Sequence, residues 1–530
     1  MGWPYQFIAL DSDQKQARRQ SLDLYAAYAQ LSALIPIVVV LLFRFGSWLT
    51  KKFSSQRGAY SAVPDSPALK QRRRTLVGHF ASIKRRVVWW LGDEVVFLGM
   101  NWGQRAQIVV GIVWAVWLVF LSVIGTGNDY LHLTKRFGIV ALSQLPLQYL
   151  LALRVINPVA LAFGSSHEQV NRWHRVLGWV VYLLLFAHAC LYLNFYIQEG
   201  ILAERLVRLI PALGVAGFIG MSLMNTTALK TIRQYSYRVF FLTHLTVALL
   251  LPPAIFFHSH HGGRQYVVEA LLFFLIDIAK RKIDTVTAPA VLELIPGTSL
   301  IKIVFSIPSQ KISRFRKYPG MHVYLSIPPG SRRSAGISAA TYLLFEATFN
   351  PFTIASVDEE SGDLTLVAKR QKGPMTKALV RCAADSLAAT KIPLSLIATE
   401  NPAAKVQMVW AVRGAGDATW STAEGILDDD NIQLYLTGNI LENTSDVTTG
   451  LTDDNEAVEL EDSMYANRGE IRKRPNLRKI VDDIFRQGVE DRVAVLVCGP
   501  EEMARELRSY VGTWVHKGRD VWWHNENFAW

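Results

Sequence analysis

The chain has 530 residues, enough for two or three domains, and half of these residues are hydrophobic. A formal net charge of +12 at neutral pH would suit a nucleic-acid partner, but the basic residues gather beside apolar runs, where they set membrane orientation. We therefore expect no nucleic-acid binding. The three cysteines are far apart, which excludes a disulfide framework and a clustered thiolate metal site.

Before residue 281 the apolar residues form runs long enough to cross a bilayer core of roughly 30 Å. We predict seven membrane-spanning helices, near residues 24–44, 106–124, 137–153, 176–197, 207–226, 239–257 and 265–279. The seventh is the weakest, because it is short and carries Glu269 and Asp277. The lipid bilayer is thus the first expected partner.

The charges of the loops predict the orientation of the spans. The loop 51–105 is the most basic, and lysines and arginines also mark the segments after the fifth and seventh spans. The loops 125–134, 198–206 and 258–264 are nearly neutral. We therefore expect an N-terminus outside and residues 281–530 in the cytosol. The plasma membrane is the expected location, and a vacuolar or reticular membrane stays open.

The rest of the chain reads as a soluble part with two patterns. The first is a set of short β-type runs punctuated by Gly, Pro and Ser, which predicts an antiparallel barrel: Leu292–Leu294, Leu300–Phe305, His322–Ile327, Tyr342–Phe349 and Leu364–Ala368. The second alternates strands with a helix, which predicts a parallel sheet: Val406–Val412, Ile432–Leu436, the helix Leu477–Gln487 and Val493–Val497. Residues 441–463 between them are polar and acidic, and we expect a loop there.

Four histidines form a ladder in the membrane part. His174 and His188 lie fourteen residues apart on the fourth span, and His244 and His258 lie fourteen apart on the sixth. Fourteen helical steps return a side chain to nearly the same face about 21 Å along the axis. Both spans run from inside to outside, so the first members of the two pairs are level, as are the second members. Two bis-imidazole sites result, which suit two low-spin b-type haems whose iron carries no open position.

The alternative is that these are ordinary histidines on helix faces, which matched spacing and matched depth disfavour, because an imidazole in lipid is costly without a partner. The remaining histidines near the spans, His132, His167, His260 and His261, lie outside the ladder, and we expect them to be solvated. A metal-docking role for the cluster from His258 to His261 stays open as a second interpretation.

Several motifs resemble one family. In the membrane part they are Trp173-His174-Arg175-Val-Leu-Gly178-Trp179, Tyr237-Arg238-Val-Phe and the four ladder histidines; in the soluble part they are Tyr318-Pro319-Gly320, Asn350-Pro351-Phe352-Thr353, Lys369-Arg370-Gln-Lys372-Gly373-Pro-Met-Thr376, Cys498-Gly499-Pro500 and Asn527-Phe528-Ala-Trp530. With them the chain, from about residue 100 on, resembles the fungal ferric/cupric reductases, membrane flavocytochromes related to the NADPH oxidases.

The resemblance implies a role for each motif. The four ladder histidines would bind two haem b groups through their iron, and FAD would meet Asn350, Pro351, Phe352, Thr353, Lys369, Gly373 and Thr376. Asn350 replaces the family's usual histidine and cannot stack an aromatic ring. For NADPH the resemblance implies Cys498, Gly499 and Pro500 beside the nicotinamide, with Phe528 and Trp530 near the flavin ring.

The implied fold class is multi-domain: a seven-helix membrane bundle, an antiparallel β-barrel flavin domain and an incomplete α/β nucleotide-binding domain. We place a first span and basic loop in residues 1–100, the haem domain in 101–282, the FAD domain in 283–380 and the NADPH domain in 381–530.

The NADPH domain is called incomplete because its glycine-rich loop is missing. The family's phosphate cradle needs a strand, a Gly-rich turn and a helix, yet no glycine occurs from Val380 to Arg413. The run Ile392–Ile397 resembles the helix that follows this turn. Three explanations stay open: an error in the gene model, a natural loss of NADPH chemistry, or a site rebuilt from other residues.

The implied activity is electron transfer from cytosolic NADPH, through FAD and the two haems, to an external Fe(III) or Cu(II) chelate. Two alternatives remain: a superoxide-generating NADPH oxidase, and a non-catalytic haem-binding protein with a defective NADPH site. The equal fourteen-residue spacing of both pairs favours the reductases, because the oxidases usually have one pair a residue closer. The oligomeric state is not readable from the sequence.

Overall fold

The computed structural model describes most of the membrane part and the separate elements of the soluble part. The described residues are 4–54, 76–97, 100–165, 167–259, 261–295, 299–308, 311–312, 315, 322–328, 350–358, 360–370, 374–385, 392–398, 408–412, 432–436, 475–487 and 493–526. The chain divides into two compact units, Met1–Lys280 with Gly488–Trp530, and Arg281–Gln487. We call them unit 1 and unit 2.

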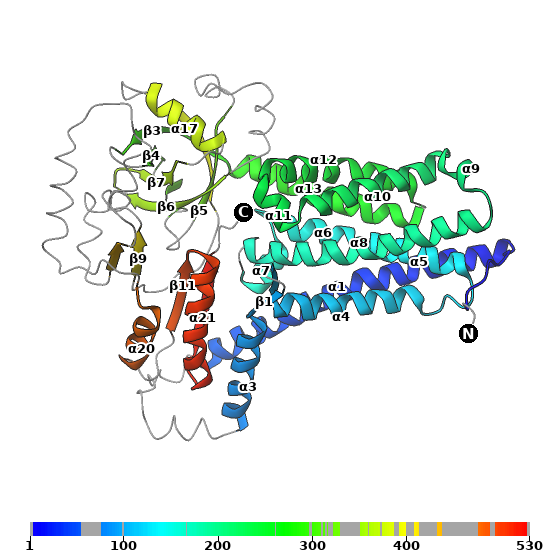
Figure 1. Cartoon of the computed structure of the whole chain (residues 1–530), viewed down its shortest axis with the longest axis horizontal. Helices are drawn as coiled ribbons and strands as arrows, with labels where there is room; N and C mark the ends of the chain where they lie inside the picture. Colours follow the sequence, from blue (N-terminus) through cyan, green and yellow to red (C-terminus); the bar gives the residue numbers. More distant parts are fainter. Residues whose placement is uncertain are drawn as a thin grey trace, which may run out of the picture. The chain divides into compact units, whose positions relative to one another are not determined.

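Unit 1 is built mainly from helices that run side by side (Figure 1). Its elements in chain order are α1 (Ser12–Ser54), α3 (Leu76–Leu91), β1 (Glu94–Phe97), β2 (Met100–Gln104), α4 (Arg105–Val123), α5 (Tyr130–Ser143), α6 (Leu145–Ala152), α7 (Pro158–Phe163), α8 (His167–Gln198), α9 (Leu202–Leu206), α10 (Leu209–Thr227), α11 (Lys230–Tyr235), α12 (Tyr237–His258), α13 (His261–Asp284), β11 (Val493–Cys498), α21 (Glu501–His516) and β12 (Val521–Glu526).

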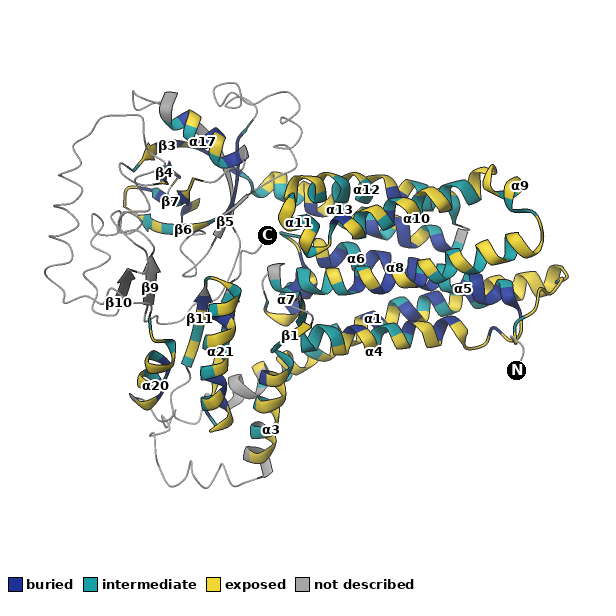
Figure 2. Cartoon of the chain, viewed as in Figure 1, coloured by how far each residue is buried: buried dark blue, intermediate teal, exposed yellow. Residues whose placement is uncertain are grey.

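Five helices among the described residues are long and apolar enough to cross a membrane: Ser12–Gly46, Arg105–Val123, Gln169–Gln198, Leu209–Thr227 and Tyr237–His258. Many of their large apolar side chains are exposed on the outside of the bundle, as the yellow stripes along α4 and α10 in Figure 2 show. That is the pattern of a helix bundle whose surroundings are lipid. Five of the seven predicted spans are thereby confirmed as membrane-compatible helices.

The predicted third span, 137–153, is not one helix. Helix α5 ends at Ser143, and α6 starts at Leu145 with Pro146 in its first turn. Proline lacks an N–H and is favoured in the first turn of a helix, so Pro146 suits the start of a new helix here. The hydrophobic run alone did not reveal this break.

The seventh predicted span is helix α13, which is 24 residues long but does not meet the hydropathy criterion of the five. The two acidic residues of the predicted span are paired inside the bundle. Glu269 accepts a hydrogen bond of 2.5 Å from the Gln30 amide on α1. Asp277, only 1% exposed, accepts from the backbone N–H of Arg154 at 3.2 Å and of Val155 at 3.0 Å. Carboxylates among helices need such partners.

Unit 2 contains a closed barrel of antiparallel strands in the order β3-β4-β7-β6-β5-β8. The strands are β3 (Val286–Leu294), β4 (Leu300–Ser306), β5 (His322–Ser326), β6 (Asn350–Asp358), β7 (Asp363–Lys369) and β8 (Ile392–Ala398), and helix α17 (Pro374–Asp385) follows β7. Burial alternates along β3 and β7, so every second side chain enters the core with Phe305, Ile303 and Leu366, all 0% exposed. The predicted antiparallel barrel is confirmed.

One prediction in this region is wrong. Ile392–Ile397, expected to be a helix, is part of strand β8, which pairs with both β3 and β5 and closes the barrel. Ile392, Leu394 and Leu396 recur at every second position, which is the period of a strand. This local pattern, and not the resemblance to the family's helix, predicts the observed structure. The barrel therefore continues past residue 380. The predicted strand Tyr342–Phe349 and the loop 441–463 lie outside the described residues.

The α/β elements follow the sequence closely. In unit 2, β9 (Met408–Val412) pairs in parallel with β10 (Ile432–Leu436), and α20 spans Leu477–Gln487. In unit 1, β11 and β12 pair in parallel and α21 connects them. Parallel pairing, predicted from strand–helix alternation, is confirmed for both pairs.

The barrel core generates a test. Ile303→Ala removes three methyl or methylene carbons from a fully buried position and should lower the stability of unit 2 by about 2–5 kcal/mol. Val291→Ala on the neighbouring strand, whose side chain is 36% exposed, is the control and should cost much less. The midpoint of thermal proteolysis of the full chain, followed through barrel fragments, measures both. Equal midpoints for the two variants would contradict this core assignment.

Candidate functional site

The four ladder histidines meet in two pairs, one residue from α8 and one from α12 in each. The rings of His174 and His244 have centroids 6.1 Å apart, and those of His188 and His258 lie 6.4 Å apart. Two imidazoles that bind one metal ion from opposite sides, with metal–nitrogen bonds of about 2.0 Å, would have centroids about 6.3 Å apart. Both pairs therefore have the spacing of two axial ligands.

Backbone carbonyls orient three of the four rings. Nδ1 of His174 lies 2.9 Å from the backbone oxygen of Gln148. Nδ1 of His188 lies 2.8 Å from the backbone oxygen of Thr134, and Nδ1 of His258 lies 2.8 Å from that of Ile210. A carbonyl can only accept, so each Nδ1 must carry the proton, and each Nε2 keeps its lone pair. A neutral imidazole with Nδ1–H bonded to a carbonyl is the usual form of a metal-binding histidine.

The fourth ring, His244, lacks such a bond: its Nδ1 is buried and has no hydrogen-bond partner among the described residues. Phe240, one turn earlier on α12, lies against it with a centroid distance of 5.3 Å. A buried polar nitrogen without a partner costs free energy unless something else binds it. The described contacts therefore set the tautomer of three rings, and His244 is the one ring whose Nδ1 they do not bind.

Two glycines make room for the rings near one end of the bundle. A Cβ on Gly138 would lie 2.6 Å from Cε1 of His188, and a Cβ on Gly214 would lie 2.5 Å from Cε1 of His258. No side chain fits at that distance, so α5 and α10 approach the histidines only because these residues are glycines. The two glycines are present in the sequence, but their role is visible only when the structure shows which helices pack against the histidines.

Two histidines outside the ladder are not solvated, contrary to expectation. His132 is 8% exposed, and its Nε2 lies 2.9 Å from Nη2 of the buried Arg136, which also donates to Ser21 at 2.6 Å. His167 is bonded through Nδ1 to the Leu153 oxygen at 2.9 Å. Both belong to polar contacts that join helices, which a periodicity argument does not detect. His260 and the side chain of His261 lie outside the described residues.

No cluster of three or more metal-binding side chains occurs among the described residues. The two histidine pairs are therefore the metal-binding candidates of this part of the chain, and two protein ligands per site require a prosthetic group to supply the rest of the coordination sphere.

The predicted flavin residues lie along one region of the barrel in unit 2. Asn350, Pro351 and Phe352 open strand β6, and Thr353 pairs with His322 of β5. Lys369 ends strand β7, and α17, which contains Thr376, begins five residues later. Backbone N–H groups at the start of a helix are a common binding site for phosphate oxygens. Gly373 lies outside the described residues.

Helix α17 is fixed to the barrel by its apolar face. Met375, Ala378, Leu379 and Cys382 are all buried in the same core as the strands. Because these side chains hold the helix, its first turn keeps a defined place next to the end of β7. The arrangement suits a site for a phosphate-bearing cofactor at this end of the barrel.

Comparison with known proteins matches two segments of the chain to two ferric reductase family models. Residues 137–255 match the model of the ferric reductase like transmembrane component, and residues 380–512 match that of the ferric reductase NAD binding domain. The chain is a relative of the fungal ferric reductases. The expectation from the motifs is confirmed at this level.

Individual relatives of this ferric reductase-like chain are distant in sequence. A probable metalloreductase AIM14 of Meyerozyma guilliermondii is 22% identical over 74% of this chain and 85% of that protein. A probable ferric reductase transmembrane component of Eremothecium gossypii is 23% identical over 51% of this chain and 38% of that protein. A probable cell surface ferric reductase kap2 of Aspergillus oryzae is 26% identical over 45% and 31%, respectively.

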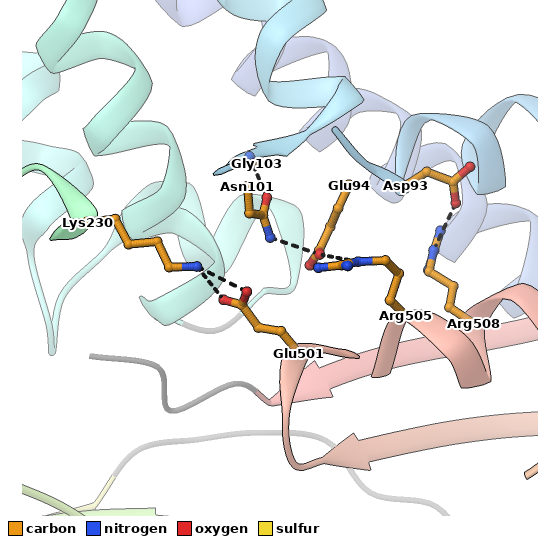
Figure 3. A network of polar contacts seen from close by, with 8 residues as sticks. All are labelled: Asp93, Glu94, Asn101, Gly103, Lys230, Glu501, Arg505 and Arg508. Atoms are coloured by element: carbon orange, nitrogen blue, oxygen red, sulfur yellow. Dashed lines mark hydrogen bonds and ion pairs between the residues drawn. The ribbon is translucent and has the colours of Figure 1, made fainter. Parts of the chain in front are cut away.

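The C-terminal residues that the family resemblance assigns to NADPH lie in unit 1 of this chain. Cys498 ends strand β11, Gly499 follows, and Pro500 is the N-cap of α21. The next residue, Glu501, accepts two hydrogen bonds of 3.0 Å from Lys230 at the start of α11 (Figure 3). This ion pair holds the turn after β11 against a loop of the membrane part. Phe528 and Trp530 lie outside the described residues.

A second contact, which the sequence did not predict, joins α21 to the segment before α4. Arg508 donates to the Asp93 carboxylate at 3.0 Å (Figure 3). It also donates to the Trp89 oxygen at 2.8 Å, and its guanidinium lies 4.1 Å from the centre of the Trp89 ring. Burial lowers the pKa of the Arg508 guanidinium, and the hydrogen bond and charge of Asp93 raise it in opposition. The guanidinium keeps its charge because its usual pKa lies so far above neutrality.

The same junction contains aromatic and glycine packing. Trp89 is 8% exposed and meets Trp523 of β12 edge to face at 5.9 Å. A Cβ on Gly512 would lie 2.8 Å from Nε1 of Trp89, so α21 needs a glycine there. We name this set of contacts, Trp89 and Asp93 with Arg508, Gly512 and Trp523, the α3–α21 junction.

The junction gives a second test. Arg508→Ala removes two charge-assisted hydrogen bonds from a side chain that is only 13% exposed, which should cost about 1–3 kcal/mol. The opened form should rise roughly five- to a hundredfold, visible as faster native-state proteolysis of residues 493–526. Arg505→Ala is the control, because Arg505 is 45% exposed and 3.9 Å from Glu94. Unchanged proteolysis of the Arg508 variant would contradict the role of this contact.

Proposed function

We propose that this chain is a transmembrane oxidoreductase that moves electrons from cytosolic NADPH, through FAD and two b-type haems, to Fe(III) or Cu(II) outside. The observation that carries the proposal is the pair of bis-histidine sites with centroid distances of 6.1 and 6.4 Å on α8 and α12. The family matches at 137–255 and 380–512 support the same function. When bound, the flavin converts a hydride into single electrons, which the haem irons accept and release one at a time.

The histidines of this chain have two tasks in such a mechanism. His174 with His244, and His188 with His258, would each supply two Nε2 ligands to one haem iron, a set that suits electron transfer rather than binding of a further ligand. The carbonyls of Gln148, Thr134 and Ile210 hold three of the rings in place, so the coordination sphere does not have to reorganise when the charge of the site changes.

The bundle keeps the two sites dry and separate. Leu177, Val181 and Leu184 lie on α8 between His174 and His188, and all three are buried in the bundle core. A low dielectric between two redox sites limits the solvent reorganisation that accompanies each transfer. The fourteen-residue spacing, about 21 Å along the helix, suits two successive hops rather than one.

On the cytosolic side, we propose that FAD occupies the barrel region of Asn350–Thr353, Lys369 and Thr376, with Gly373 in the same motif. Lys369 would offset diphosphate charge, and the N–H groups at the start of α17 would donate to it. NADPH would meet Cys498, Gly499 and Pro500, with Phe528 and Trp530 near the flavin ring. The proposed orientation is an outside N-terminus and a cytosolic soluble part, in the plasma membrane.

One observation favours a second candidate, a haem-binding membrane protein that NADPH cannot supply with electrons. No glycine occurs between Val380 and Arg413, where the phosphate cradle of a reductase is expected, and strand β8 of the barrel occupies part of that stretch. Fewer backbone N–H groups would then reach the pyrophosphate.

An absorbance spectrum of the purified full chain decides between these functions. Addition of NADPH should reduce the low-spin b-type bands, and dithionite should add little further reduction. Reduction by dithionite alone would support the second candidate instead. The absence of low-spin bands would overturn the haem assignment. NADPH-driven superoxide release without any metal chelate would favour an oxidase over a metal reductase.

Single histidine variants test the pairing. His188→Ala should remove one of two haems, so the dithionite-reduced band should fall to about half, while external chelate reduction is lost. His516→Ala on α21, a histidine whose Nδ1 lies 2.7 Å from the Gly512 oxygen of the same helix, is the matched control and should leave the band intact. A full-height band in the His188 variant would show that this residue is not a ligand.

A further inference from the structure

Helix α3 presents two opposite faces. Trp89 points into the α3–α21 junction and is 8% exposed. Half a helical turn away from it, the side chains of Phe80, Ile83 and Val87 form a stripe and are 70%, 46% and 47% exposed. Nothing among the described residues covers this stripe. Three large apolar residues in a row on an exposed face are costly in water.

Cationic and aromatic residues border the stripe. Lys84 and Arg86 are exposed on the flanks of α3. Trp90 is 52% exposed, with the Arg105 guanidinium 5.0 Å from its ring centre. The hairpin that follows adds Phe97 and Trp102, which are 61% and 58% exposed. An apolar stripe between cations and interfacial aromatics is the composition of a helix that lies in the headgroup region of a membrane.

The stripe is continuous with the lipid-facing surface of the first span. The Lys84 ammonium lies 5.9 Å from the ring centre of Phe43 on α1, a ring that is 69% exposed. Phe45 and Trp48, just past this point on α1, stack at 5.9 Å and are both more than half exposed. The apolar run predicted as the first span ends near residue 44 of α1, and Lys51 and Lys52 follow it. Helix α3 therefore touches α1 at the level where that span leaves the lipid.

We propose that α3 and the β1–β2 hairpin dock onto the anionic cytosolic leaflet of the membrane. Phe80, Ile83 and Val87 enter the interface, and Lys84 and Arg86 bind lipid phosphates or carboxylates. The sign of the charges and the continuity with α1 identify lipid as the occupant. The choice of leaflet rests on the proposed orientation, in which the loop 51–105 is cytosolic.

This docking gives α3 a second role through its other face. Trp89, on the side of α3 opposite the stripe, and Asp93, two residues after the helix, both bind Arg508 of α21. Lipid contact on one face would therefore fix the depth of the C-terminal segment that carries Cys498, Gly499 and Pro500.

The test places an environment-sensitive NBD label on the stripe of the full chain in lipid nanodiscs, on a background with the three native cysteines replaced by serine. Val87→Cys carries the label, and Ser509→Cys, exposed on α21, is the matched control. Lipids with a doxyl group near the headgroup should quench the label at 87 strongly and the label at 509 hardly at all. Elution of each sample as a single species in size-exclusion chromatography checks the fold. No haem, NADPH or acceptor enters this readout, so failure here is separate from failure of the proposed function.

The charge requirement is tested in the same samples. With phosphatidylserine present, Lys84→Gln and Arg86→Gln should each weaken docking roughly fivefold, and added salt should weaken it further. Equal quenching at 87 and 509 would overturn the proposal. Quenching that is the same in neutral and anionic discs would overturn its anionic part. A label at 87 that is shielded from water but not quenched by lipid would assign the stripe to a protein partner, which also overturns it.

Discussion

The structure of the membrane part depends on the hydrogen bonds between histidine Nδ1 atoms and backbone carbonyls. Each of these bonds ties a ladder ring to a different helix: His174 to α6, His188 to α5 and His258 to α10. The bonds explain several other features at once. The break between α5 and α6 brings the Gln148 carbonyl to His174, and the glycines at 138 and 214 let α5 and α10 come close enough to the rings. Packing, backbone and ligand orientation are thus parts of one arrangement.

The sequence predicted the elements that follow a strong period. The fourteen-residue histidine spacing, five long apolar helices and the strands β4, β10 and β11 all appear near their predicted residues. In each case one local rule, a helical repeat or a two-residue alternation, decides the structure. The barrel and the parallel pairs followed from the same rules, together with the turn residues between the strands.

What the sequence did not predict depends on contacts between distant residues. The local contacts of His132 do not reveal its burial, because Arg136, its neighbour on α5, is itself held by Ser21 and Tyr25 of α1, more than a hundred residues earlier. The loop 51–105 is recognised in the sequence only by its basic charge. In the structure it contains α3 and the β1–β2 hairpin, and Trp89 and Asp93 of this segment bind α21 some 400 residues later. The run Ile392–Ile397 resembles a family helix, but its apolar residues alternate at the period of a strand, and it pairs with β3 as strand β8.

The division of the chain has a mechanical consequence. Unit 2 is an insertion within unit 1, since the chain leaves the membrane part at Lys280 and returns at Gly488. The α3–α21 junction anchors the returning end, so unit 2 is tethered at two points rather than one. A doubly tethered domain searches a much smaller volume than one on a single linker, and its effective concentration at the membrane part is correspondingly higher. A cut in the backbone near residue 488 would remove no residue, but unit 2 would then be linked to unit 1 at one end only.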